Sequence, residues 1–147
     1  MSENLEDVRL AAAGLIARLA HKGQMDRNGE PYIGHPKAVA SYVGTKEEKT
    51  VALLHDVVED TDVTEEELRP IFGKRITDAV MLLTHEEGVP YLDYVRNLKD
   101  NPLAKTVKLA DLKHNMDLSR CKGEVPQDMY ERMEKKYKPA YRILTQD

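Results

Sequence analysis

Residues 53–60 read Leu-Leu-His-Asp-Val-Val-Glu-Asp, and this stretch has an apolar half and an acidic half. On a helix, where each residue turns by about 100°, Asp56, Glu59 and Asp60 fall within an arc of about 140° that starts at His55. The leucines and valines fall on the opposite arc, where they can pack against a core. The stretch therefore predicts an amphipathic helix that presents an imidazole and three carboxylates on one face.

This acidic face is an unfavourable choice for a helix that only needs to be soluble. Asp56 and Asp60 are like charges at positions i and i+4, and such pairs weaken a helix by roughly 0.2–0.5 kcal/mol. The acids also lie near the expected C-terminal end, where the helix dipole disfavours negative charge. No Lys or Arg lies between Lys49 and Arg69 to neutralise them. A bound cation would offset this repulsion, so the pattern indicates a functional site.

Two further stretches can complete a cation site. His35 precedes Pro36, and proline suits the start of a helix while it keeps the residue before it out of helical geometry. Asp111 and Asn115 are four residues apart, on one face of another expected helix. Two imidazoles with two carboxylates suit a divalent first-row metal that keeps positions open for water. Spacing alone leaves a second interpretation open, in which His35 is a capping or core histidine.

The rest of the chain predicts an all-α fold of about seven or eight helices, with no convincing strand pair. Residues 24–34 contain Asn28-Gly29 and Pro31 and are typical of an ordered loop. Helices are expected at about 5–22, from 36 onward, and at about 46–60, 65–72, 74–84, 91–98, 101–119 and from beyond 126 to 144. In the last helix, apolar side chains recur every three or four residues and predict core packing: Tyr130, Met133, Tyr137, Tyr141 and Leu144.

Length and composition favour a single domain that spans residues 1–147. The formal net charge of −4 argues against broad affinity for nucleic acid or anionic membrane, although a small phosphorylated ligand needs only a local group of cations. Cys121 is the single cysteine, so no internal disulfide can form, and the N-terminus lacks the positive start of a signal peptide. We therefore expect a cytoplasmic protein, and the sequence does not predict its oligomeric state.

The motifs, taken in order, resemble a known family. His35, then His55-Asp56, then Asp111 are similar to the H…HD…D signature of the HD-superfamily phosphohydrolases. The sequence segments around these residues point to one branch of that superfamily. They are His21-Lys22-Gly23-Gln24, Gly29-Glu30-Pro31-Tyr32-Ile33-Gly34-His35-Pro36, His55-Asp56-Val57-Val58-Glu59-Asp60-Thr61 and Val107-Lys108-Leu109-Ala110-Asp111. Together, over residues 20–120, they resemble the hydrolase domain of RelA/SpoT proteins and the small alarmone hydrolases. The resemblance implies one compact HD-domain helical bundle, without the synthetase or regulatory domains of the long proteins.

The resemblance also implies roles for individual residues. One metal ion, typically Mn²⁺ in this family, would be held by His35, His55, Asp56 and Asp111. Glu59 and Asp60 would be the catalytic acids that position or deprotonate the attacking water. Substrate contacts would come from Arg27 and Asn115, and Lys22 and Lys108 are further candidates for a phosphate-binding rim, although most Lys residues are ordinary surface residues. The implied reaction removes the 3′-pyrophosphate of guanosine tetra- or pentaphosphate.

Three positions depart from the family's base-reading pattern. Asp26 stands where a basic residue usually stacks on guanine, Leu112 follows the metal aspartate where a basic residue is usual, and Leu118 replaces a Thr or Ser. Two alternatives therefore stay open: an HD phosphohydrolase acting on another phosphorylated nucleotide, and a catalytically weak nucleotide-binding sensor. We interpret His21 and His114 as structural, and His85 has no motif partner.

Overall fold

The computed structural model describes residues 2–146, and within that range it contains helices and no β-strand. The α-helices are α1 (Ser2–Ala20), α2 (Gly34–Ser41), α3 (Lys46–Leu54), α4 (Val57–Asp60), α5 (Glu65–Leu83), α6 (Tyr91–Leu98), α7 (Pro102–Asn115), α8 (Gln127–Arg132) and α9 (Lys138–Thr145). A short 3-10 turn spans Leu118–Arg120, and a π-helical turn, Met133–Tyr137, joins α8 to α9. The all-α prediction is confirmed. None of the described helices is both long and apolar enough to cross a bilayer.

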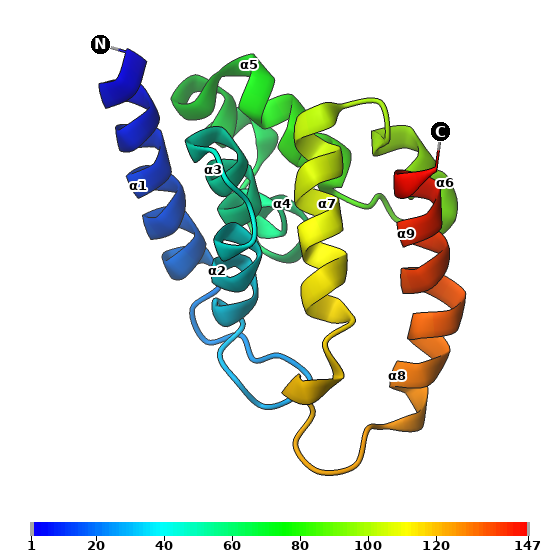
Figure 1. Cartoon of the computed structure of the whole chain (residues 1–147). Helices are drawn as coiled ribbons and strands as arrows, with labels where there is room; N and C mark the ends of the chain where they lie inside the picture. Colours follow the sequence, from blue (N-terminus) through cyan, green and yellow to red (C-terminus); the bar gives the residue numbers. More distant parts are fainter. Residues whose placement is uncertain (1, 147) are drawn as a thin grey trace.

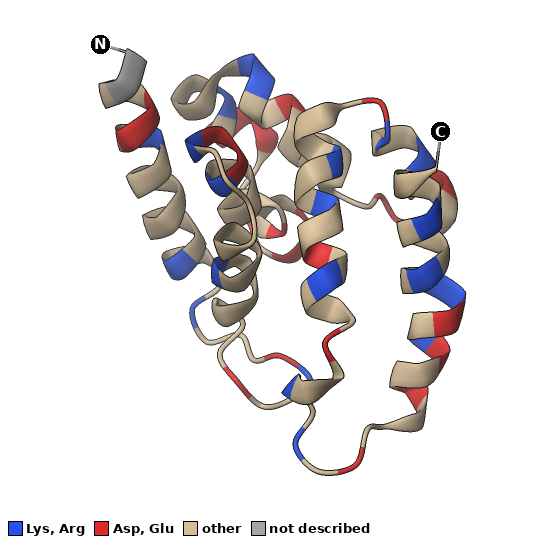
Figure 2. Cartoon of the chain, viewed as in Figure 1, with Lys and Arg blue, Asp and Glu red and all other residues tan. Residues whose placement is uncertain are grey.

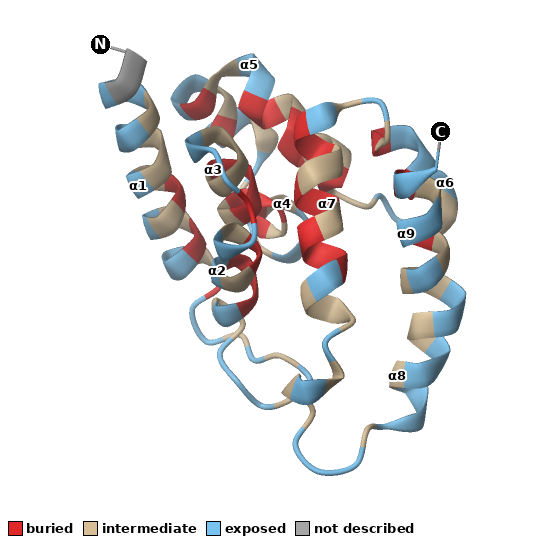
Figure 3. Cartoon of the chain, viewed as in Figure 1, coloured by how far each residue is buried: buried red, intermediate tan, exposed pale blue. Residues whose placement is uncertain are grey.

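Helix α7 lies between α3 and α9 and contacts both, α1 packs on the other side of α3, and α2 contacts both α3 and α7 (Figure 1). Buried residues gather on the faces that these helices turn toward one another (Figure 3). Leu54 of α3, Phe72 of α5 and Leu112 of α7 are fully buried there. Leu112 thus belongs to the core, which explains an apolar residue at that position. The loops before α2 and after α7 come together at one end of the bundle (Figure 1).

Side-chain caps determine where three of the helices begin. The hydroxyls of Thr45 and Thr64 accept from the backbone N–H groups of Glu48 and Glu67, and these glutamates bond back to the capping residues. Asn101 caps α7, whose first residue is Pro102. These caps fix where α3 and α7 begin, and α3 leads into the turn that carries His55 while α7 carries Asp111.

The prediction of one helix over residues 46–60 is wrong, because α3 ends at Leu54 and α4 begins at Val57. The backbone of Asp56 has φ −108° and ψ 0°, outside the helical range. Both the backbone N–H and the Nδ1 atom of His55 bond to the carbonyl of Ala52, which tightens the chain at this point. The histidine and the aspartate therefore occupy a turn between two helices.

The core prediction for the last helix is only partly right. Ala140 and Leu144 are fully buried, but Tyr130 and Tyr141 are each 48% exposed. The π-helical turn adds a residue to one turn, since the N–H of Lys138 bonds to the carbonyl of Met133, and this rotates the residues that follow.

Gly73 provides a test of the fold, because it separates the two halves of α5 with φ 79° and ψ 174°. Side chains are nearly excluded from this backbone region, and a Cβ there would lie 3.2 Å from Arg9 Nη2. We expect Gly73→Ala to lower the free energy of unfolding by about 1–3 kcal/mol in urea titrations. Gly14→Ala is the matched control: it lies inside α1 with room for a methyl group and should stabilise the protein by up to about 1 kcal/mol. Equal effects would contradict the backbone explanation.

Candidate active site

Three segments that are distant in sequence meet at the centre of the molecule. His35 lies in the first turn of α2, His55 lies in the turn after α3, and Asp111 lies in α7. His35 Nε2 is 2.8 Å from Asp111 Oδ1, and His55 Nε2 is 3.3 Å from the same oxygen. One ligand atom from each of these three buried residues lies within 4.8 Å of the other two, so one ion can contact all three.

Asp56 adds a fourth side chain to this cluster. Its Oδ2 atom lies 3.1 Å from His55 Nε2 and 3.7 Å from His35 Nε2. The hydroxyl of Tyr32 donates to the same oxygen at 2.5 Å and holds the carboxylate in place. The structure therefore brings together the two histidines and two aspartates that the sequence singled out.

The hydrogen bonds of His55 test whether this cluster suits a metal ion. A carbonyl oxygen cannot donate, so His55 Nδ1 must carry the proton in its 2.6 Å bond to the Ala52 carbonyl. In the neutral ring Nε2 then keeps its lone pair, and this buried atom has no hydrogen-bond partner. A lone pair that faces two carboxylates needs a cation between them. The donor set of neutral imidazoles and carboxylates fits a divalent metal.

The charges of the cluster support the same conclusion. Burial alone would raise the pKa of Asp56, but the charge and hydrogen bond of a protonated His55 outweigh burial and bring the pKa down to about 2. Burial would lower the pKa of His55, yet the two carboxylates raise it well above its usual value. The site therefore strongly favours positive charge, which a bound proton or a metal ion can supply.

Two residues of α7 hold Asp111 in place. Lys108 Nζ donates to Asp111 Oδ2 at 2.8 Å, and Asn115 Nδ2 donates to Asp111 Oδ1 at 3.3 Å. Lys108 is buried, with its ammonium about 5 Å from the ring centroids of Tyr91 and Tyr94. Its sequence-based role as a substrate contact stays a prediction, since the contact seen here is with an expected metal ligand.

Glu59 and Asp60 lie one turn further along, in α4. The carboxylate of Glu59 accepts the backbone N–H of His85 at 2.7 Å. Partial burial raises the pKa of both acids, and the charge of Asp56 raises both further. Both acids line the same cavity as the four-residue cluster, and neither forms an ion pair with a Lys or Arg side chain within residues 2–146, so they remain open to a substrate or a water.

Two cavities meet at this cluster. The acid-lined cavity, of about 360 Å³, is bounded by Asp56, Glu59, Asp60 and Asp111 together with residues of the last helix. The adjacent cavity, of about 530 Å³, lies against the loops before α2 and after α7. Residues common to both walls are Arg27, Tyr32, His35, Asn115 and Tyr137. A two-part ligand can therefore place one end at the acids and the other in the adjacent cavity.

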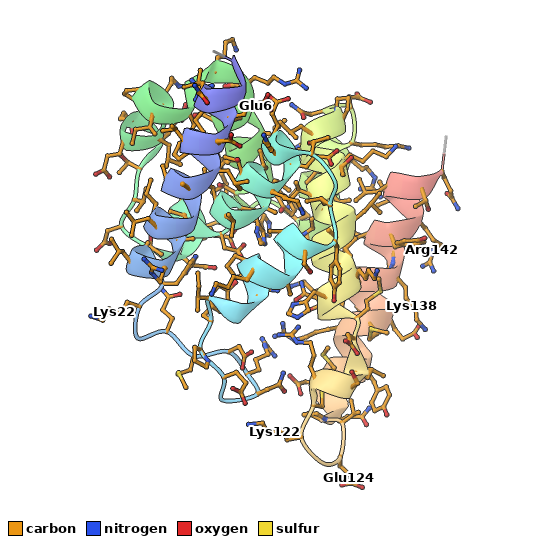
Figure 4. The ribbon with its side chains drawn as sticks, turned by 60° about the vertical axis from the view of Figure 1, so that its left-hand side comes forward. Glu6, Lys22, Lys122, Glu124, Lys138 and Arg142 are labelled. Atoms are coloured by element: carbon orange, nitrogen blue, oxygen red, sulfur yellow. The ribbon has the colours of Figure 1, made fainter. Side chains whose placement is uncertain are left out.

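Four carboxylates line the acid-lined cavity together with Arg132 and Lys136 of the last helix, a helix that carries both basic and acidic residues (Figure 2). Arg27 reaches both cavities and pairs with Asp128 at 3.1 Å. Lys22, by contrast, lines neither cavity and points away from the body of the protein (Figure 4). The structure thus places Arg27 and Asn115 at the site and leaves Lys22 outside it.

Asp26, one of the three residues that depart from the family pattern, makes structural contacts. Its Oδ1 atom accepts the backbone N–H groups of Asn28 and Glu30 and so closes the loop turn. Its Oδ2 atom lies 3.4 Å from Arg120, which lines the adjacent cavity. A guanidinium is therefore present in this cavity, although it comes from a different part of the chain.

Three residues that the sequence reasoning left without a functional role contact the expected site residues. Tyr32 bonds to Asp56, the backbone of His85 bonds to Glu59, and His114 Nδ1 lies 2.7 Å from His35 Nδ1. Burial, followed by the charge of Arg120, lowers the pKa of His114 to about 4, so its ring is neutral near pH 7. Tyr32 and His114 each lie three residues from an expected metal ligand in sequence, which is a usable signal for supporting contacts.

This arrangement defines a class: a helical domain in which a His, a His-Asp pair and a distant Asp enclose a space suited to a divalent ion. A family model described as "HD domain" matches residues 12–117. The chain belongs to the HD domain family.

Individual proteins within this family show which members the chain is similar to. The chain is 38% identical over 148 residues to a guanosine-3′,5′-bis(diphosphate) 3′-pyrophosphohydrolase from Haemophilus influenzae, which covers 86% of this chain and 20% of that protein. The chain thus spans about a fifth of the length of that relative. It is 38% identical to the pyrophosphohydrolase MESH1 of Danio rerio, over 82% of this chain and 71% of the relative. A solved structure titled "A metazoan ortholog of SpoT hydrolyzes ppGpp and plays a role in starvation responses" matches 93% of this chain and 85% of its own, with a TM-score of 0.75 and 25% identity.

Proposed function

We propose that this chain is a metal-dependent hydrolase that removes the 3′-pyrophosphate of guanosine tetra- or pentaphosphate. The observation that supports it most is the convergence of His35 and Asp111 on His55 and Asp56, beside two acids that share one cavity. The names of its relatives point to the same substrate. The substrate is a small nucleotide, and we place the reaction in the cytoplasm.

His35, His55, Asp56 and Asp111 would hold the ion, for which we propose Mn²⁺. When bound there, it would supply a Lewis acid beside the reacting phosphoryl group. Lys108 orients Asp111 by donating to its Oδ2 atom, and Tyr32 orients Asp56 by donating to its Oδ2 atom. The protein's own contribution to metal binding is therefore a set of ligands already fixed in position.

Glu59 and Asp60 are the residues that would move the proton. Water attacks the phosphorus bonded to the 3′-oxygen, a carboxylate accepts a proton from that water, and the bond to the 3′-oxygen breaks as that oxygen gains a proton. Pyrophosphate and the nucleoside 5′-diphosphate, or triphosphate, are the products. Partial burial raises the pKa of each acid above its ordinary value, which makes each carboxylate a stronger base.

A nucleotide panel tests this proposal. Purified protein, with its metal content measured on the same sample, is incubated with Mn²⁺ and a set of guanine and adenine nucleotides with and without 3′-phosphates. We expect pyrophosphate release from guanosine tetraphosphate above all others. Rapid cleavage of a different nucleotide would show that the substrate is wrong, and binding without turnover by metal-loaded protein would favour a sensor.

His114 offers a separate test of the metal site. In our proposal its neutral ring accepts the Nδ1 proton of His35, which leaves His35 Nε2 free to bind the ion. We expect His114→Ala to weaken Mn²⁺ affinity by about 10- to 100-fold in a competition assay with a chelating dye. Lys113→Ala, at the exposed neighbouring residue, is the control. Unchanged affinity in His114→Ala would show that the contact does not support the ligand.

A further inference from the structure

The π-helical turn places a second set of side chains across the acid-lined cavity from the acids. Arg132, Lys136 and Tyr137 all line this cavity, and they come from the turn itself or the residue before it. Such turns are rare and occur often at functional sites. This segment also lies beyond residues 12–117, the part of the chain that matches the family. It therefore adds to the site something that the family motifs do not include.

The cations on this side of the acid-lined cavity, Arg132 and Lys136, and the neighbouring Arg27 are poorly neutralised by carboxylates. Arg27 and Arg132 share one carboxylate, Asp128 Oδ2, at 3.1 and 3.8 Å, and that side chain is 59% exposed. Lys136 makes no ion pair with any carboxylate of residues 2–146, and its ammonium lies 4.9 Å from the ring centroid of Tyr91. Burial lowers the pKa of Lys136, and the nearby charges of Arg132, Lys108 and Arg27 lower it further. Crowded cations of this kind are unfavourable unless an anion joins them.

The distribution of charge in the cavity indicates a function for Arg132 and Lys136. The opposite wall holds four carboxylates, so an anion that approaches the acids needs cations on the other side. Lys108 cannot serve fully, because it is paired with Asp111 at 2.8 Å. Guanidinium and ammonium groups form strong charge-assisted bonds to phosphate oxygens. The last helix supplies such groups to the acid-lined cavity through Arg132 and Lys136.

We propose that Arg132 and Lys136 bind the pyrophosphate group of the substrate and form the phosphate-binding wall of the acid-lined cavity. This inference rests on the proposed function and assigns to it a second half of the site. Arg27 joins them when a phosphate oxygen replaces Asp128 between the two guanidinium groups. Nucleotides that lack a second phosphate at the reacting end would make fewer contacts with this wall and would bind more weakly.

The test measures binding of inorganic pyrophosphate and turnover of guanosine tetraphosphate by the full chain. Metal-loaded, dialysed protein is titrated with pyrophosphate in a calorimeter. We expect Arg132→Gln and Lys136→Gln each to weaken binding by about tenfold or more, with a similar rise in KM and a smaller change in kcat. Lys136→Arg, which keeps the charge, should stay close to the unmodified protein.

Two matched controls lie on the same continuous helix but face solvent. Lys135 is exposed next to Lys136, and Arg142 points away from the body of the protein (Figure 4). Lys135→Gln and Arg142→Gln should change pyrophosphate affinity by less than about twofold, as expected of exposed charges. Circular dichroism and urea unfolding verify the fold of each variant.

The outcomes separate this inference from the proposed function. If the protein cleaves guanosine tetraphosphate and Lys136→Gln and Arg132→Gln change neither KM nor pyrophosphate affinity, the wall is wrong and the function stands. If the protein leaves that nucleotide intact but loses pyrophosphate affinity in both variants, the wall stands and the substrate is wrong. Absence of any pyrophosphate binding by the unmodified protein overturns the wall.

Discussion

Asp56→Ala is expected to abolish both metal binding and hydrolysis. Its Oδ2 atom is the point at which His35, His55 and Tyr32 meet, so its loss removes one of the two carboxylates that lie beside both imidazoles. Loss of a contact outside the ligand shell already costs about 10- to 100-fold in affinity, and loss of a ligand should therefore exceed about 100-fold. Metal content by mass spectrometry and pyrophosphate release measure the two effects on one sample.

The low pKa of Asp56 strengthens this expectation. At about 2, it keeps the carboxylate ionised throughout the pH range in which a protein is assayed, so its charge is always available to a cation. Asp62→Ala, in the exposed loop after α4, is the matched control and should keep full metal content. A stoichiometric metal ion in Asp56→Ala would remove this residue from the ligand set and leave Glu59 or Asp60 to take its place.

The sequence predicted the helical class because helix periodicity and helix ends are local properties. Thr64, Asn101 and Pro102 act within their own turn and start α5 and α7. The break after Leu54 was missed because neither a glycine nor a proline marks it in the sequence. It depends on His55 turning toward Asp111 and on Tyr32 holding Asp56, and these partners lie in other parts of the chain. A periodic pattern read along one segment cannot contain that information.

The same reasoning explains what was predicted of the site. Residues within a recognisable motif, such as His35 and Asp111, can be grouped from the sequence alone. Arg132 and Lys136 could not, because they belong to no motif and a regular helix was assumed there. A single extra residue in one turn decides which side chains face the cavity. That choice depends on packing against α6 and α7, which the spacing of apolar residues does not reveal.

Glu59→Gln and Asp60→Asn should separate catalysis from metal binding. Both substitutions keep the shape of the side chain, and a glutamine at 59 can still accept the N–H of His85. Neither acid is in the four-residue cluster, so we expect metal content to stay unchanged. Without a carboxylate to accept the proton of the attacking water, kcat should fall by about 10²-fold or more.

Comparing the metal content of these variants with that of Asp56→Ala distinguishes a catalytic acid from a metal ligand. Glu66→Gln, at an exposed position in the first turn of α5, is the matched control for the loss of one acidic charge and should turn over normally. Metal-loaded but inactive Glu59→Gln or Asp60→Asn would assign proton transfer to that acid. If both variants lose metal as completely as Asp56→Ala, then Glu59 and Asp60 are ligands, and the proton acceptor must be sought among the other groups that line the acid-lined cavity.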